Sequence, residues 1–310
     1  MTPPPRPYRD AQDLEKMKAL LVLGRQATNG TYYVHTGDLD WWLYYPSVQR
    51  DWGEIIFLWD GSRPDGQLNG WALLSPEWRT FDVFVHPQAR GTALANELYA
   101  WAEEQIARIV GLSGGKDIRT MWVLEDDAAL VSHLYQRGFV RSEAHLKLYK
   151  RGLDGLLPMA SLPAGFQVRH VAGEADGQER ARASHAAFGS EKAFEAYWQR
   201  YKRFMDSPAY IPELDLVSVA PDGRFASFCT CWLDPVNRVG LFEPVGTHPD
   251  FQRLGLGKAV MLEGLLRMQA SGMLTAIVGA ESDNPAAQGL YRSIGFQAVN
   301  KLWTYRKNLE

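Results

Sequence analysis

The sequence has few cysteines, no long apolar run and no cluster of like charges, and each deficit excludes a class of protein. The two cysteines, Cys229 and Cys231, lie two residues apart in a strand-like run, so a disulfide framework is excluded and both are expected to be buried. No nearby Cys/His group completes a zinc site, so no metal is expected. No apolar stretch approaches the ~20 residues of a membrane span. The N-terminal residues MTPPPRPYRD lack the apolar core of a signal peptide, so we expect a soluble, cytoplasmic protein without a membrane partner.

The charge balance argues against a nucleic-acid partner. The chain has 33 basic and 36 acidic residues, with a net charge of −3 and no basic run. Its 310 residues, 46% of them hydrophobic, are enough for two domains with sizeable cores. The 11 tryptophans are unevenly distributed, because Trp198, Trp232 and Trp303 are the only ones after residue 155.

The chain contains an internal repeat. The segment 85–91 (VHPQARG) is matched by 247–253 (THPDFQR), and the Gly-Phe pair at 138–139 by that at 295–296. Two matches in the same order and at similar separation indicate a duplicated domain rather than a solenoid. We therefore expect a first copy at 1–150 and a second at 166–310. The segment 151–165, with three Gly and two Pro, is the expected linker.

The order of expected elements defines the fold class. The second copy gives β-α-α-β-β-β-α-β-α-β, with strands at 215–220, 225–233 and 238–247 and a helix at 257–271. The first copy follows the same order, except that region 28–53 replaces the second helix and is expected to be irregular. We expect an α+β fold with two tandem domains, each a mostly antiparallel mixed sheet flanked by helices.

The most informative segment is the glycine-containing loop Gln252–Lys258, which follows a strand and opens a helix. Glycines let backbone N–H groups converge, and the helix N-terminus adds positive potential. Such a loop suits a pyrophosphate. It matches neither the dinucleotide-binding G-x-G-x-x-G pattern nor the P-loop. Further on, Asn284 and Tyr291 are two helical turns apart and so share one helix face.

The pair Gln252-x-x-Gly255-x-Gly257 and Asn284-x-x-Ala287-x-x-Leu290-Tyr291-x-x-x-Gly295-Phe296 resembles the GNAT superfamily of N-acetyltransferases over residues 166–307. The resemblance implies that Asn284 contacts acetyl-CoA and that Tyr291 is the general acid near its sulfur. It also implies that the preceding strand end pairs with the pantetheine arm and that the loop amides hold the pyrophosphate. These implied cofactor-binding residues are Val245, Gly246, Thr247, Gln252, Arg253, Leu254, Gly255, Leu256, Gly257 and Lys258.

An ammonium acceptor must lose a proton before it attacks a thioester, so a carboxylate base is required. Glu243 precedes the loop at a position where many members of the family carry a base, and Phe242 and Pro244 would desolvate it. Glu281 and Asp283 are rival candidates, and Glu213 and Asp215 are weaker ones.

The first copy has lost much of this pattern. The glycine loop becomes Arg90–Ala95 with Ala93 at the middle glycine, and Asp127 and Leu134 replace the Asn and Tyr. Allowing a one-residue gap would instead align Tyr135 with Tyr291. Counting without a gap aligns Phe81 with Glu243, with Asp82 beside it. We expect this copy to be catalytically incompetent, with at most weak CoA binding.

The sequence therefore predicts an acetyl-CoA-dependent N-acetyltransferase with its chemistry in the second copy. It acts on an amine, for which a small molecule is favoured over a protein. The alternative is a non-catalytic CoA-binding sensor or interaction module. The aromatic-rich first copy is expected to pack against the second and help form its pocket. Tandem copies often pack as a pseudo-dimer, so a monomer is expected.

Overall fold

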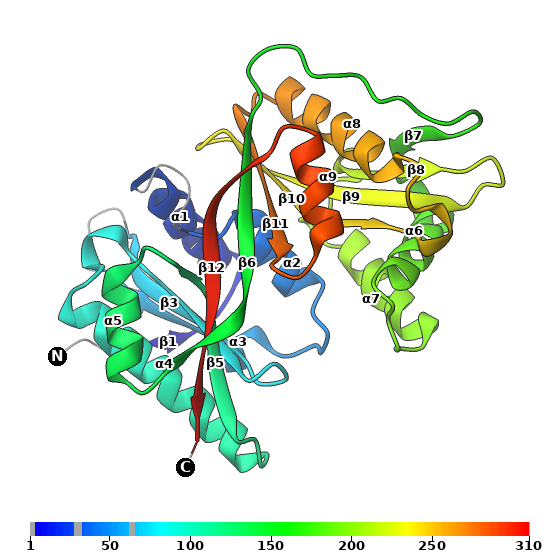
Figure 1. Ribbon diagram of the computed structural model, residues 1–310. Helices are drawn as coiled ribbons and strands as arrows, with labels where there is room; N and C mark the ends of the chain where they lie inside the picture. Colours follow the sequence, from blue (N-terminus) through cyan, green and yellow to red (C-terminus); the bar gives the residue numbers. More distant parts are fainter. Residues whose placement is uncertain (1–3, 28–32, 62–65, 310) are drawn as a thin grey trace.

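The computed structural model describes residues 4–27, 33–61 and 66–309. Its strands form one mixed sheet of twelve, in the order β1-β2-β3-β4-β5-β12-β6-β11-β10-β9-β8-β7 (Figure 1). The strands are β1 (Arg6–Pro7), β2 (Ile56–Asp60), β3 (Leu68–Ser75), β4 (Thr80–Val85), β5 (Asp117–Leu124), β6 (Val140–Gly152), β7 (Gln167–His170), β8 (Asp215–Val219), β9 (Phe225–Asp234), β10 (Val239–Thr247), β11 (Thr275–Glu281) and β12 (Gln297–Asn308).

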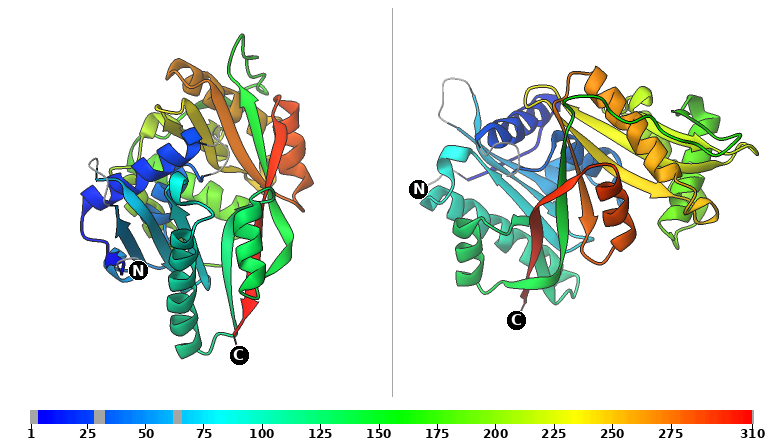
Figure 2. Two further views of the ribbon diagram at one scale, coloured as in Figure 1. Left: turned by 90° about the vertical axis from the view of Figure 1, so that its left-hand side faces the viewer. Right: turned by 45° about the horizontal axis from the view of Figure 1, so that its top comes forward.

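The strand order is symmetric about its centre, which reflects the repeat. Each strand of the first half, which we define as the chain through β6, has its counterpart at the mirrored position in the second half. The two final strands are exchanged: β12 pairs with β5 of the first half, and β6 pairs with β11 of the second. β6 and β12 also pair with each other along most of their length, so they join the halves (Figures 1 and 2).

Helices cover both halves of the sheet. The helix α4 packs on β3, β4 and β5, and α8 packs correspondingly on β8, β9 and β10. The buried faces of α4 and α8 therefore lie against the central strands of each half, where the two main cores form. The helices are α1 (Ala11–Ala27), α2 (Thr36–Tyr44), α3 (Trp52–Ile55), α4 (Ala93–Leu112), α5 (Ala128–Gln136), α6 (Gly173–Ala187), α7 (Phe194–Met205), α8 (Leu256–Ala270) and α9 (Pro285–Ser293), with short 3₁₀ turns at Pro87–Ala89, Pro212–Leu214 and Pro249–Phe251.

The expectation that region 28–53 is irregular was wrong for residues 36–44, which form α2. His35 caps this helix: its ring Nδ1 accepts from the Gly37 N–H, and the Asp38 carboxylate accepts from the His35 N–H at 2.8 Å. This reciprocal arrangement satisfies two backbone donors that would otherwise lack partners. Histidine is an unusual cap, so no residue here signals the start of a helix. Residues 28–32 lie outside the described part of the chain.

Two kinds of feature are absent from the described residues. No helix there has the length and apolar character needed to cross a membrane. The same residues hold no group of three or more His, Cys, Asp or Glu side chains placed to ligate a metal.

Candidate active site

The candidate site opens where two parallel strands separate. β10 and β11 pair from Val239 to Phe242 of β10, and the pairing ends there. Beyond Phe242 a bulge interrupts the pairing of β10 with β9 as well. A cavity of about 330 Å³ lies at this separation, and Glu243, Val245, Asn284 and Tyr291 are among the residues that line it. Four residues expected at a single site from the sequence thus share one cavity.

The two expected catalytic side chains influence each other electrostatically. Burial, together with the negative charges of Asp38 and Glu281, raises the pKa of Glu243 to about 8. Burial raises the pKa of Tyr291 well above its usual value, and the nearby Glu243 carboxylate adds to this effect. A carboxyl group that titrates near neutral pH is suited to proton transfer. A tyrosine held neutral remains a proton donor.

The other carboxylates are placed less favourably. Glu281 lines the same cavity, and burial beside Asp283 raises its pKa, but its side chain is largely exposed. Asp215 is fully buried in an ion pair with Arg180 at 3.0 Å, so it has a structural role. Glu213 and Asp283 are exposed and do not line the cavity. Glu243 is therefore the best placed of the five.

The loop beyond β10 has the features of an anion-binding cradle. Gly255 has φ of 77°, in the left-handed region that suits glycine, and it is the N-cap of α8. The helix bonds begin with the Ala259 N–H donating to the Gly255 carbonyl at 3.0 Å. The N–H groups of residues 256–258 precede that bond and have no acceptor within the helix. Arg253 and Lys258 are exposed beside them, which adds positive charge.

Close packing fixes the start of this helix. A Cβ at Gly257 would lie 3.0 Å from the Thr247 Oγ1 and 3.4 Å from a Leu290 methyl group, so only glycine fits comfortably. At the other end of the site, the Asn284 side chain caps α9 by accepting from the Ala287 N–H at 3.0 Å. The separated strands and α9 line the cavity, and the glycine loop begins a few residues beyond the end of β10. Of the other residues expected to bind the cofactor, Gly246 lies in β10, and Gln252 directly follows the 3₁₀ turn Pro249–Phe251. Leu254 and Leu256 flank Gly255.

Sequence reasoning missed most of what the first half contributes to this cavity. Arg25, His35, Asp38, Trp42 and Trp122 all line it. The His35 ring is fully buried and donates from Nε2 to the Val239 carbonyl at 3.1 Å, and burial lowers its pKa to about 3. Burial raises the pKa of Asp38 to about 6. Only the tryptophans gave a signal in the sequence, through their clustering.

The corresponding cleft of the first half is filled by the protein itself. β4 and β5 pair through Phe81 and Thr120 and then separate, as β10 and β11 do. The Tyr33 hydroxyl donates to the Val85 carbonyl, and the Tyr99 hydroxyl donates to the Val83 carbonyl at 3.1 Å. Only about 20 Å³ remains between the strands. Two tyrosines therefore occupy the β4 edge whose counterpart on β10 is open.

The helix α5 supports the alignment that counts back from Gly138 without a gap, in which Asp127 matches Asn284 and Leu134 matches Tyr291. Asp127 caps α5 by accepting from the Leu130 N–H, as Asn284 caps α9, and Asp127 also pairs with Arg90 at 2.8 Å. Leu134 is buried at the position of Tyr291. Tyr135, the gapped alternative, is 52% exposed and is not the counterpart.

The alignment of Phe81 with Glu243 was wrong. Phe81 packs on Phe139 with ring centroids 6.0 Å apart, as Phe242 packs on Phe296 at 6.3 Å. The bulge after Phe242 adds one residue to β10, and β4 pairs with β3 without one. The alignment made without a gap was therefore shifted by one residue in this strand. Asp82, directly after Phe81, is the counterpart of Glu243.

Comparisons with known proteins identify the family that this chain resembles. Residues 180–296 match the family model described as "Acetyltransferase (GNAT) family". A "Mycothiol acetyltransferase" from Nocardioides sp. is 30% identical over 231 residues, covering 69% of this chain and 75% of the relative. The GCN5-related N-acetyltransferase of Sphaerobacter thermophilus has a TM-score of 0.67 at 20% identity, covering 98% and 95% of the two chains. A tandem GNAT protein from the clavulanic acid biosynthesis pathway has a TM-score of 0.69 at 15% identity, covering 98% and 97%.

The fold and these similarities together define an acyltransferase. Both structural neighbours share the fold along nearly the whole chain, and one of them is itself a tandem protein. The identity to the Nocardioides relative extends over most of both sequences. The chain belongs to the GNAT acetyltransferase family, as a tandem member.

Proposed function

We propose that this chain transfers the acetyl group of acetyl-CoA to the amine of a small molecule, and that the reaction takes place in the second half. The observation that carries the proposal is the shared cavity in which Glu243 and Tyr291 both form part of the wall where β10 and β11 separate. The curated relatives are named for a small-molecule acceptor, which supports the choice of acceptor class.

In the proposed reaction, Glu243 accepts a proton from the ammonium form of the acceptor. The neutral amine attacks the thioester carbonyl carbon, so a C–N bond forms as the C–S bond breaks. Tyr291 gives its proton to the departing thiolate and regains one from the attacking nitrogen, which loses its second proton as the amide forms. Glu243 then releases the proton that it accepted to solvent. Glu243 needs a raised pKa for this role, and its enclosure beside Asp38 and Glu281 provides it. Tyr291 is suited to its role because its neighbourhood keeps the phenol protonated.

The first half has a different role in this proposal: it shapes the acceptor end of the cavity. Trp42 and Trp122 stack with ring centroids 5.3 Å apart and line the cavity from that side. Trp41 packs edge-on against Phe204 at 5.0 Å, across the contact between the halves. The chain would then work as a monomer, with residues 1–150 structural and 166–310 catalytic, joined by 151–165.

The test is an acetyl-transfer assay with a panel of small primary amines. Release of free CoA thiol is followed together with mass spectrometry of the amine. We expect amine-dependent thiol release in the wild type and loss of most of it in Glu243→Gln. Thiol release that no amine accelerates would contradict the proposal and favour the non-catalytic CoA-binding alternative.

A further inference from the structure

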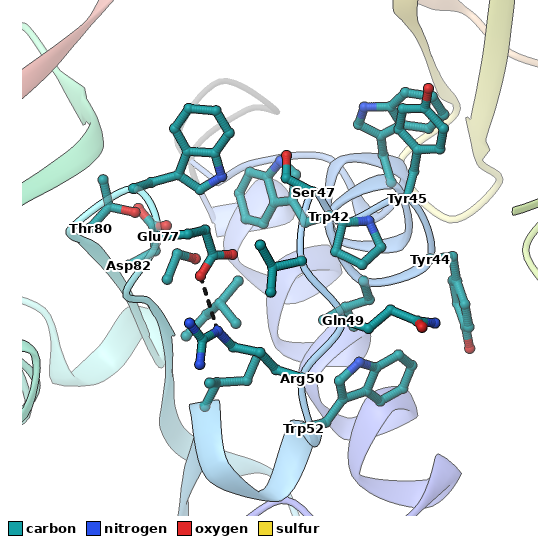
Figure 3. A pocket seen from close by; sticks show the side chains of 18 of the residues that line it. Trp42, Tyr44, Tyr45, Ser47, Gln49, Arg50, Trp52, Glu77, Thr80 and Asp82 are labelled. Carbon is teal, nitrogen blue, oxygen red and sulfur yellow. Dashed lines mark hydrogen bonds and ion pairs between the residues drawn. The ribbon is translucent and has the colours of Figure 1, made fainter. Parts of the chain in front are cut away.

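A second cavity, of about 600 Å³, lies on the first half, next to the one described above. Figure 3 looks into it: Trp42, Tyr44 and Trp52 approach from one side, and Thr80 and Asp82 of β4 from the other. We call it the aromatic pocket, after the lining residues Trp42, Tyr44, Trp52, Trp78 and Trp122. The stacked pair of Trp42 and Trp122 lines both cavities and so forms their common wall.

Asp82 is the buried acid of this pocket. It is only 7% exposed, and a hydrogen bond from the Met121 backbone N–H reaches its carboxylate. Its Oδ1 atom has no hydrogen-bond partner within the described part of the chain. A buried carboxylate oxygen is costly unless a donor satisfies it. Asp82 is among the residues that line the pocket, so a ligand bound there would lie next to this carboxyl group.

The arginines around the pocket do not neutralise Asp82. The Arg50 Nε pairs with Glu77 at 3.1 Å, and a dashed line marks this pair in Figure 3. The Arg119 Nε pairs with Asp117 at 3.1 Å, and the Arg200 Nε donates to the Tyr45 carbonyl at 2.9 Å. The fourth lining arginine, Arg203, is exposed to solvent. Among the described residues no ion pair reaches Asp82, so the buried carboxyl group next to the aromatic walls has no cationic partner, and burial raises its pKa to about 7.

The backbone at Trp122 is held in an unusual conformation that presents its ring to the pocket. Trp122 has φ of 62°, in the left-handed region that bulky side chains rarely adopt. Strained backbone of this kind concentrates at ligand sites, where packing enforces it. At Trp122 the conformation accompanies the stacking of its ring on Trp42, at an interplanar angle of 28°.

We propose that the aromatic pocket binds an organic ammonium ion, with its nitrogen at Asp82 and its apolar body against Trp42 and Trp122, and that the first half does not acetylate it. Aromatic faces attract cations, and a carboxylate accepts the ammonium protons. The volume lies within the range of small-molecule sites. Asp82 is the counterpart of Glu243, but Tyr33 and Tyr99 fill the cleft where a thioester would lie, so the ligand is bound and released unchanged. This site goes beyond the proposed function and does not depend on it.

The experiment is isothermal titration calorimetry on the full chain with tryptamine. The control ligand is tryptophol, which has the same indole ring and a hydroxyl group in place of the amine. We expect tryptamine to bind the wild type about tenfold more tightly than tryptophol, because the hydrogen bond to Asp82 is charge-assisted. Asp82→Asn should weaken tryptamine binding by about tenfold, whereas Glu243→Gln, which alters the other cavity, should leave it unchanged.

A second variant guards against a folding defect in Asp82→Asn. Ser75→Trp fills the pocket from a half-buried lining position and leaves Asp82 in place, so it should weaken tryptamine binding at least as much as Asp82→Asn does. Wild-type affinity in both variants would overturn the proposal, as would equal affinity for tryptophol or no tryptamine binding by the wild type. Loss of binding in Glu243→Gln alone would overturn it too, because it would place the amine in the active-site cavity. None of these outcomes depends on whether the chain turns over acetyl-CoA.

Discussion

The Tyr149 ring packs edge-on against the Tyr291 ring, with centroids 5.8 Å apart and an interplanar angle of 68°. Tyr149 belongs to β6, the last strand of the first half, and Tyr291 to α9 of the second. Tyr149 is fully buried, so the side chain that we propose as general acid rests on a residue contributed by the other half. This contact is a direct consequence of the exchanged strands.

Replacing Tyr149 should therefore damage both stability and activity. Tyr149→Ala leaves a cavity beneath Tyr291, and we expect the free energy of unfolding to fall by about 3–5 kcal/mol, as for other large buried aromatics. Denaturant unfolding measures this change. The control is Tyr135→Ala, at a side chain 52% exposed, where we expect a change within about 0.5 kcal/mol. Similar losses in the two variants would argue against the packing role of Tyr149.

The dependence of activity on pH should follow Glu243. Its pKa of about 8 means that the carboxyl is mostly protonated at neutral pH and becomes a base as pH rises. We expect kcat/KM to increase from pH 6 upward and to level off above about pH 8. In Glu243→Gln the rate should fall about 100-fold or more, and any remaining pH dependence would come from the acceptor. A wild-type profile that is flat between pH 6 and 9 would contradict the assignment.

Tyr291→Phe tests the proton donor separately from the base. The ring is retained and only the hydroxyl is removed, so packing against Tyr149 should survive. We expect kcat to fall about 100-fold with little change in the dissociation constant for CoA. Stopped assays of thiol release and calorimetry with CoA measure the two quantities. Wild-type turnover in this variant would show that another group protonates the thiolate.

The glycine loop should determine cofactor affinity. In Gly255→Ala the backbone must hold an alanine at φ of 77° or move away from it, and either change displaces the N–H groups at the start of α8. We expect CoA to bind about tenfold more weakly. Gly111→Ala, at a position with open space and ordinary φ, is the matched control.

The wild type should bind one CoA per chain because Tyr33 and Tyr99 fill the other cleft, and two tight sites would contradict this expectation.

The exchanged strands predict how the chain can be divided. A fragment that starts after residue 152 lacks β6 and exposes the edge of β11, and a fragment that ends there lacks β12 beside β5. We expect each fragment to be insoluble when produced alone and the two to form a soluble, active pair when co-expressed. Size-exclusion chromatography with a thiol-release assay measures this. A stable, active second fragment on its own would show that β6 is dispensable.

Much of the fold could be predicted because the duplicated motifs are local. Neighbouring residues determine the His-Pro turns, the glycine loop and the helix caps at Asn284 and Asp127. They also determine most of the helices and strands between these motifs. The strand exchange could not be predicted, because pairing β6 with β11 or with β5 gives the same pattern of apolar residues. The one-residue slip at Phe81 had a related cause, since a bulge in β10 changes the count without changing the motif on either side.

The candidate site was only half visible in the sequence. Glu243 and Tyr291 lie within recognisable motifs, and the structure places both on the wall of one cavity. His35, Asp38 and Arg25 reach the same cavity from the first half, but they contact it through tertiary packing that no local pattern encodes. Part of the tryptophan excess of the first half has a structural explanation, because five of its tryptophans line the aromatic pocket, among them Trp42 and Trp122 in the wall between the two cavities.

The central position of β12 also constrains the biosynthesis of the chain. As residues 1–152 leave the ribosome, β5 has no partner on its outer edge and β6 has no β11 to join. β6 cannot pair with β11 until the residues up to 281 have been translated, and β5 cannot pair with β12 until those up to 308 have. Pairings between residues so far apart in sequence form slowly, and open strand edges invite association with other chains in the meantime. Nascent chains of this protein should therefore depend on chaperones for longer than those of a single-copy relative of the same fold.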